Sequence, residues 1–149
     1  MAFFTDYTTL QATIANYLAR SDLTNSIPEF IRLAEDRLAR DLRIRQMLQI
    51  ANTTITSTDG TVEIPADFLG MKDIHISSSN PIQTVTFQSP SNFFRNTRAL
   101  TSGLPTFYTA LGSEFRFAPI GSSTDTIQML YYVKPPYMSS TVSSNLWLA

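Results

Sequence analysis

The sequence predicts an α+β fold: an N-terminal αα-hairpin followed by a mostly antiparallel β-rich region with one short inserted helix. Apolar residues recur with helical spacing over residues 10–42, whereas short alternating runs separated by turn residues begin at about residue 53. Because the two patterns are segregated along the chain, most strands should pair with antiparallel neighbours. We therefore expect a helical region, 1–50, and a β-rich region, 51–149, which together form one compact domain.

Two capping-box patterns predict where the helices begin. The sequence Thr8-Thr9-Leu10-Gln11 opens the first helix, and Ser26-Ile27-Pro28-Glu29 opens the second, with proline in the first turn, where it is tolerated. The second helix should extend over about 27–48. The apolar face of the first helix is expected to be Leu10, Ile14, Tyr17 and Leu18, and that of the second Ile27, Ile31, Ala34, Leu38 and Leu42.

Short alternating runs predict the strands of the β-rich region. The candidates are 53–56, 61–64, 71–77, 82–87, 107–111, 114–118 and 126–133. Asp59-Gly60 predicts a hairpin between the first two, and Gly112-Ser113 and residues 78–81 predict two further turns. Residues 89–97 are expected to form the inserted helix, with Pro90 at its first position.

The composition excludes several classes of protein. The chain has 149 residues, a formal net charge of −1 and no cysteine. A protein that binds nucleic acid non-specifically would carry a basic excess, and a chain without cysteine has no disulfide, thiolate nucleophile or cysteine metal site. No apolar run approaches the ~18 residues that span a membrane. The N-terminus lacks the positive charge of a signal peptide, so we expect none.

Few residues could support catalysis or metal binding. His75 is the single histidine of the sequence, and it shares a strand face with Asp73. Asp59, Glu63 and Asp67 are evenly spaced but lack the pattern of a calcium loop. Neither set forms a recognisable catalytic or metal-binding motif, so we expect no enzyme activity, no cofactor and no metal.

Residues 29–45, EFIRLAEDRLARDLRIR, concentrate five arginines and four acids. On a helix, Arg32, Asp36, Arg40 and Arg43 share a face opposite the apolar stripe, and Arg37 lies one turn from Asp41. Three interpretations stay open: a solvated, salt-bridged face; a contact between identical subunits with arginine–carboxylate pairs across the boundary; and, least favoured because the charges balance, a DNA contact. Arg45 falls on the apolar side, so either the helix ends near Ile44 or Arg45 reaches a partner.

Aromatic residues give a second indication of an interface. Phe3 and Phe4 precede the first helix, and adjacent rings occur at 93–94 and 131–132. In each adjacent pair one ring can face a local core, so the other is either buried by a second layer or is an interface anchor. The apolar residues 146–148, which include Trp147, are expected either to dock on another surface or to precede a further helix.

The ordered pattern resembles the head-to-tail adaptor (connector) proteins of tailed bacteriophages, particularly short-tailed ones. The resemblance is carried by residues 10–23, LQATIANYLARSDL, and 27–43, IPEFIRLAEDRLARDLR. It continues through Asp59-Gly60 and IPADF at 64–68, GLP at 103–105, Ala118-Pro119 and YYVKPP at 131–136. No single piece is specific, but together they cover nearly the whole chain in order.

The resemblance implies a virion structural protein that is made in the host cytoplasm and located at the portal vertex. Such adaptors form a ring, typically of twelve copies, beneath the portal protein. The ring extends the DNA channel without sequence-specific binding and provides the attachment site for tail nozzle and fibre proteins, with no membrane partner. The alternatives are another phage neck or tail-completion protein or, less favoured, a small nucleic-acid-binding module.

We expect the N-terminal helices to form the ring body and the strands to face the tail or outer partners. The family usually continues beyond Trp147 into a helical segment that contacts the portal, so we expect that element to be shortened, truncated or replaced here. The predicted interface residues are Arg32, Asp36, Arg37, Arg40, Arg43, Arg45, Phe3, Phe4 and Trp147.

Overall fold

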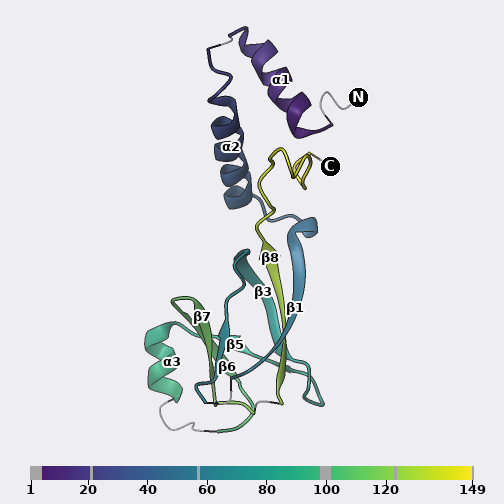
Figure 1. Ribbon diagram of the computed structural model, residues 1–149. Coiled ribbons are helices and arrows are strands. Elements are labelled where there is room, and N and C mark those ends of the chain that lie inside the picture. Colours follow the sequence, from purple (N-terminus) through teal and green to yellow (C-terminus); the bar gives the residue numbers. More distant parts are fainter. Residues whose placement is uncertain (1–4, 21, 57, 98–101, 123, 149) are drawn as a thin grey trace. The chain divides into compact units, whose positions relative to one another are not determined.

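The computed structural model describes residues 5–20, 22–56, 58–97, 102–122 and 124–148, and it confirms the expected α+β class (Figure 1). The chain divides into two compact units. A helical unit contains Met1–Met47 and Lys134–Ala149, and a strand unit contains Leu48–Val133. The C-terminal segment therefore groups with the helices. The expectation of a helical region, 1–50, and a β-rich region, 51–149, within one compact domain stays a prediction.

Helix α1, Tyr7–Leu18, begins just before the predicted cap. Asp6 is the N-cap: its carboxylate accepts from the Thr9 backbone N–H at 2.8 Å, and the Thr9 hydroxyl oxygen accepts from the Asp6 N–H at 3.1 Å. The expected Thr8–Gln11 capping box is therefore wrong by two residues. Leu10 and Ile14 pack inward as predicted, but Tyr17 and Leu18 are exposed at the end of the helix.

Helix α2, Ile27–Asp41, differs from the predicted helix over 27–48 in two respects. Ser26 occupies the N-cap position, but its side chain makes no capping hydrogen bond. The helix also stops seven residues early, because Leu42 is extended and the guanidinium of Arg43 donates to the backbone oxygen of Ala39 at 2.6 Å. This side chain satisfies a terminal carbonyl, as a C-cap residue usually would.

The buried face of α2 is rotated from the predicted apolar stripe. It consists of Ile27, Ile31, Glu35 and Ala39. The predicted stripe members Ala34, Leu38 and Leu42 are exposed, which corrects the expectation. Ile27 and Ile31 form the core of the helical unit together with Met138 of the C-terminal segment, and that segment also bonds to α1 through the Ser143 oxygen, which accepts from the Tyr7 N–H.

The strand unit contains two four-stranded sheets. Their strand orders are β1-β8-β3-β4 and β2-β7-β6-β5. The strands are β1 Leu48–Thr54, β2 Thr61–Glu63, β3 Phe68–Ile76, β4 Gln83–Thr84, β5 Thr86–Phe87, β6 Phe107–Leu111, β7 Glu114–Ala118 and β8 Thr126–Val133. Every pairing is antiparallel except β5 with β6. Each predicted strand thus has a counterpart, often with shifted ends.

Two of the three predicted turns are confirmed, and the third prediction is wrong. Gly112, with φ +61°, closes the predicted hairpin between β6 and β7, and residues 78–81 join the antiparallel strands β3 and β4. The Asp59-Gly60 hairpin is wrong, because β1 pairs with β8 and β2 pairs with β7. Gly60, with φ +65°, provides a turn that carries the chain from one sheet to the other.

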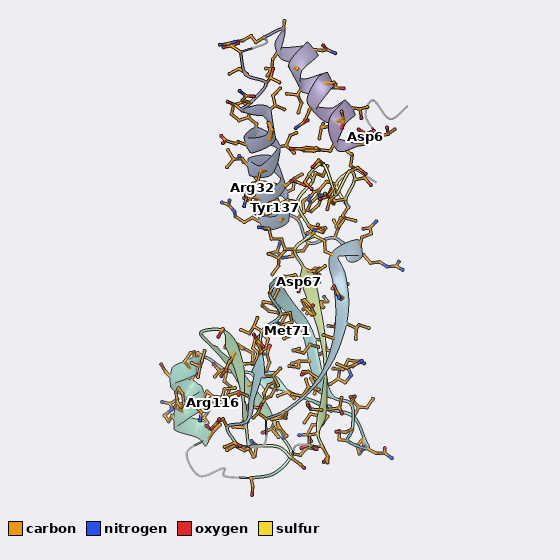
Figure 2. The ribbon with its side chains drawn as sticks, viewed as in Figure 1. Asp6, Arg32, Asp67, Met71, Arg116 and Tyr137 are labelled. Carbon is orange, nitrogen blue, oxygen red and sulfur yellow. The ribbon has the colours of Figure 1, made fainter. Side chains whose placement is uncertain are left out.

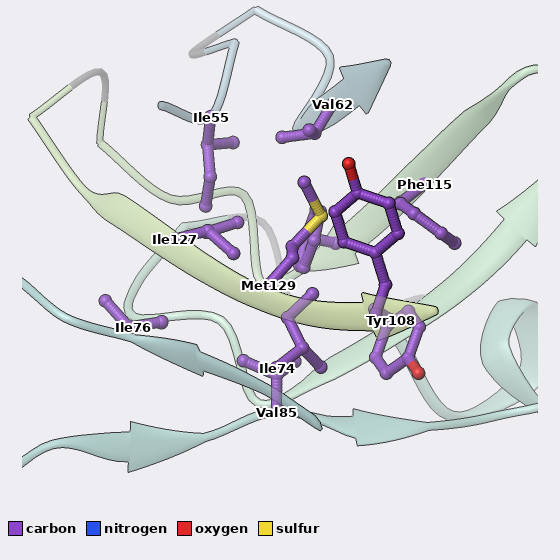
Figure 3. Close-up of a cluster of buried hydrophobic side chains, with 11 residues drawn as sticks. Ile55, Val62, Ile74, Ile76, Val85, Tyr108, Phe115, Ile127 and Met129 are labelled. Atoms are coloured by element: carbon purple, nitrogen blue, oxygen red, sulfur yellow. The ribbon is translucent and has the colours of Figure 1, made fainter. Parts of the chain in front are cut away.

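Both sheets contribute side chains to one apolar core, which Figure 3 shows in close-up. Ile74, Ile127 and Met129 come from one sheet, and Tyr108 and Phe115 come from the other. Helix α3, Pro90–Thr97, begins at the predicted Pro90 and packs against β6. As expected for an adjacent pair, Phe93 is buried at 2% exposure, whereas Phe94 is 51% exposed.

Replacing Ile127 by alanine tests this core. Ile127 is fully buried on β8, so Ile127→Ala should lower the free energy of unfolding by about 2–4 kcal/mol through lost transfer energy and a residual cavity. Ile50→Ala on the neighbouring strand β1 is the matched control, because Ile50 is 58% exposed. Urea denaturation followed by far-ultraviolet circular dichroism measures both. Equal effects of the two changes would contradict this account of the core.

Candidate interface on the second helix

A buried carboxylate attaches the C-terminal segment to α2. The side chain of Glu35 is 4% exposed. Its Oε1 accepts from the Met138 backbone N–H at 3.1 Å and from Nδ2 of Asn145 at 2.6 Å. Nδ2 of Asn145 also donates to the Pro136 oxygen at 2.8 Å, so the amide connects two parts of the segment. Glu35 therefore belongs to the fold of this unit and not to its charged surface.

Next to Glu35 on the helix, Asp36 is bound by residues of the same segment. Its Oδ1 accepts from Nζ of Lys134 at 2.8 Å and also from the hydroxyl of Tyr137. The guanidinium carbon of Arg32 lies 4.7 Å from the centroid of the Tyr137 ring, a cation–π arrangement whose partners are labelled in Figure 2. The hydrogen bonds of Asp36 among the described residues therefore come from the C-terminal segment and not from Arg32 or Arg40, its neighbours on the predicted charged face.

The other charges of residues 29–45 divide into two groups. Nε of Arg37 lies 3.5 Å from Oδ2 of Asp41, so the predicted ion pair is present. Arg43 donates to the end of α2, as described above. Arg40, in the last turn of α2, and Arg45, which begins the 3₁₀ helix Arg45–Met47, are exposed and form no ion pair with any described residue. Because α2 ends at Asp41, Arg45 does not lie on its apolar side.

One flank of α2 exposes large apolar side chains. Leu33 is 66% exposed, and Phe30 and Leu38 are also exposed. Phe30 and Leu38, but not Leu33, also line an apolar hollow of about 230 Å³. The hollow is lined on α1 by Leu10 and Ile14, on α2 by Phe30, Ile31, Ala34, Glu35 and Leu38, and on the C-terminal segment by Met138, Trp147 and Leu148. An exposed apolar surface of this kind is typical of an interaction site.

Of the three remaining predicted interface residues, the structure describes only Trp147. Trp147 is half-buried and lines the hollow, so the apolar end of the chain docks on the helices of its own unit. Phe3 and Phe4 lie outside the described residues. The structure thus brings Trp147 near α2, while the predicted role of all these residues in subunit contacts stays a prediction.

The candidate catalytic residues form no recognisable site. Nδ1 of His75 lies 3.5 Å from Oδ2 of Asp73, its expected neighbour on the strand face. Across the described ranges, no group of three or more histidine, cysteine, aspartate or glutamate side chains is arranged to hold a metal ion. In the same ranges, no helix is both long and apolar enough to cross a membrane.

Sequence reasoning missed Glu35, Lys134 and Tyr137. Glu35 looked like one more charge on a polar helix, although it lies four residues from both Ile31 and Ala39. That spacing placed it on the buried face and was a usable signal. Nothing local indicated that its hydrogen-bond donors are about a hundred residues further along the chain.

Exposed apolar and arginine side chains thus lie together on this unit, as is typical of a protein interaction surface. A family model described as SU10 adaptor protein matches residues 5–149. The chain therefore belongs to the SU10 adaptor protein family of phage adaptors, which confirms the expected relationship with head-to-tail adaptors. A search of curated proteins gave no match. Family membership assigns the chain to the virion and favours a structural over a catalytic role.

Replacing Glu35 by glutamine tests the attachment of the C-terminal segment. In Glu35→Gln, the side-chain N–H₂ group faces the Met138 N–H and the Asn145 amide, which are themselves donors. At least one hydrogen bond is lost, so the free energy of unfolding should fall by about 2 kcal/mol. Glu29→Gln is the matched control on the exposed side of α2 and should change it by less than about 0.5 kcal/mol. Urea denaturation followed by the fluorescence of Trp147, the single tryptophan, reports on this unit. Equal stability of the two variants would contradict the proposed attachment.

Acid titration tests the contact of Asp36. Hydrogen bonds from Lys134 and then from Tyr137 hold the pKa of Asp36 below its usual value of 3.8. The contact should therefore stabilise the fold fully above about pH 3.8, and its contribution should disappear as the pH falls through the lowered pKa. The difference in unfolding free energy between the native protein and Asp36→Asn, measured from about pH 6 to about pH 2, should shrink in that acid range. If the difference in unfolding free energy did not change with pH, the stabilising role of the ionised Asp36 would be contradicted.

Proposed function

We propose that this protein is a head-to-tail adaptor that assembles into a closed ring of twelve copies beneath the portal protein. The ring extends the DNA channel, through which DNA passes without sequence-specific binding, and it gives tail nozzle and fibre proteins a surface to attach to. Family membership supports this role. The observation that carries the proposal is the surface of α2, where exposed apolar side chains accompany Arg40, which forms no ion pair with a described residue.

The lateral ring contact is assigned to α2. Arg32, Asp36, Arg37 and Arg43 of the predicted set already have partners within the chain. Arg40 and Arg45 form no ion pair with a described residue, and neither does the exposed acid Glu29. Glu29 and Arg40 are three helical turns apart on one side of α2. In a head-to-tail ring, Arg40 of one copy is placed against Glu29 of the next.

The apolar flank supplies most of the energy of this contact. Phe30, Leu33 and Leu38 leave water when the next copy covers them, at roughly 25 cal/mol per Å² of apolar area. A stable ring contact buries on the order of 2,000 Å², so Trp147 is assigned to its margin, and Phe3 and Phe4 are kept as proposed contact residues without a position. The strand unit is assigned to the tail or outer partners. Arginine–carboxylate pairs then fix the orientation of neighbouring copies.

Reversing the charge of Arg40 tests the lateral contact. Arg40→Glu should abolish ring assembly, because it places two carboxylates against each other, and Arg40→Glu combined with Glu29→Arg should restore assembly. Mass photometry of the purified protein, alone and with the portal protein, measures the copy number and the complex. Arg95→Glu is the matched control, because it reverses the charge of an exposed arginine on α3. This variant should leave the ring intact.

Each result decides one part of the proposal. A ring that survives Arg40→Glu means that this part of α2 is only a solvated surface. A double variant that stays monomeric rules out Glu29 as the partner of Arg40. If the native protein forms no ring, either alone or on the portal, the adaptor ring itself is wrong. A DNA affinity that falls steeply with salt would instead favour a nucleic-acid-binding role.

A further inference from the structure

Arg116 of β7 is a half-buried cation that has no carboxylate partner among the described residues. It is the single described arginine whose side chain is not exposed. No described residue forms an ion pair with it. The half-buried cation of the helical unit, Lys134, has Asp36 at 2.8 Å. Removing a guanidinium from water costs free energy unless an acceptor replaces the water, so Arg116 carries a cost that Lys134 avoids.

The surroundings of Arg116 form a hollow with aromatic walls. The hollow has a volume of about 250 Å³ and is lined by Arg116, Ala118 and Ile120 together with Phe93, Phe94 and Thr97 of α3. Figure 2 shows Arg116 beside α3. Phe93 and Phe94 meet edge to face at 5.6 Å between ring centroids, and Phe94 leaves half of its surface exposed. A ligand could therefore contact an aromatic ring and a guanidinium at once.

The described polar neighbours of Arg116 do not form an ion pair with it. Its register partner on β6, Thr109, is fully buried, and the hydroxyl of Thr109 has no hydrogen-bond partner among the described residues. Glu63 and Glu114 oppose each other two register positions from Arg116, on the same sheet face, but neither forms an ion pair with it. Helix α3 contains no acid, and its exposed Arg95 adds positive charge.

We propose that this hollow binds an acidic side chain flanked by an apolar or aromatic residue on a partner protein. The carboxylate accepts two parallel hydrogen bonds from the planar guanidinium of Arg116, and the flanking side chain packs on Phe94. The hollow is smaller than the roughly 300–1,000 Å³ of typical cofactor pockets, and it suits one or two side chains of a protein segment. This binding site does not depend on ring assembly.

Blocked peptides test the site on the full-length protein. The probes are acetyl-Leu-Glu-Phe-amide and the same peptide with glutamine in place of glutamate, titrated by ¹H–¹⁵N correlation spectra. The glutamate peptide should bind about tenfold or more tightly than the glutamine peptide, since a charged hydrogen bond contributes roughly 1.5–3 kcal/mol. Arg116→Gln should remove this preference. Arg116→Lys, which keeps the charge but loses the planar fork, should retain only part of it.

Arg95→Gln is the matched control, because it removes the same charge from an exposed site on the adjacent helix. It should change the affinity by less than about threefold. Circular dichroism establishes that each variant is folded. The proposal is wrong if the glutamate peptide does not bind at millimolar concentration, if both peptides bind equally, or if Arg95→Gln weakens binding as much as Arg116→Gln. Tight binding of free 3-phenylpropionate with no binding of the peptide would indicate a small-molecule site and overturn the protein partner.

Discussion

The organisation of the helical unit depends on the carboxylate of Glu35. A buried carboxylate has to accept hydrogen bonds, because an unsatisfied one costs several kcal/mol. Its donors are the N–H of Met138 and the amide of Asn145, both in the C-terminal segment. The chain must therefore return to α2 after the strand unit is complete. Helices and C-terminal segment then share a core that includes Ile31 and Met138.

This constraint also determines which surface of α2 is free for a partner. The C-terminal segment covers the side that carries Glu35, and Lys134 and Tyr137 bind Asp36 next to it. The charges on that side thus stabilise the subunit itself. Leu33 and Phe30, on the opposite flank, are exposed among the described residues. A single helix therefore holds its own chain together on one side and presents an apolar surface on another.

The features that could be predicted from sequence are those that depend on nearby residues. The strands and α3 were found because alternation, glycine turns and Pro90 act locally. The end of α2 was missed, since the Arg43 side chain satisfies a terminal carbonyl where a glycine would have been recognisable. The partner of Asp36 was missed because Lys134 is 98 positions away. Arg37 and Asp41 were paired correctly because a helix places them one turn apart.

Lys134 and Arg116 are both half-buried cations, and each needs an acceptor that replaces the water lost on burial. Lys134 leaves water and gains Asp36 and the Tyr137 ring from its own unit, so its desolvation is offset when the chain folds. Arg116 leaves water beside Phe93 and Phe94 and gains no carboxylate from the described residues. Under the proposal made above, a carboxylate of a partner protein offsets this cost. An adaptor has to be stable before its partners bind and still favour their binding, and a partly buried cation that gains its proposed carboxylate only on assembly would meet both requirements.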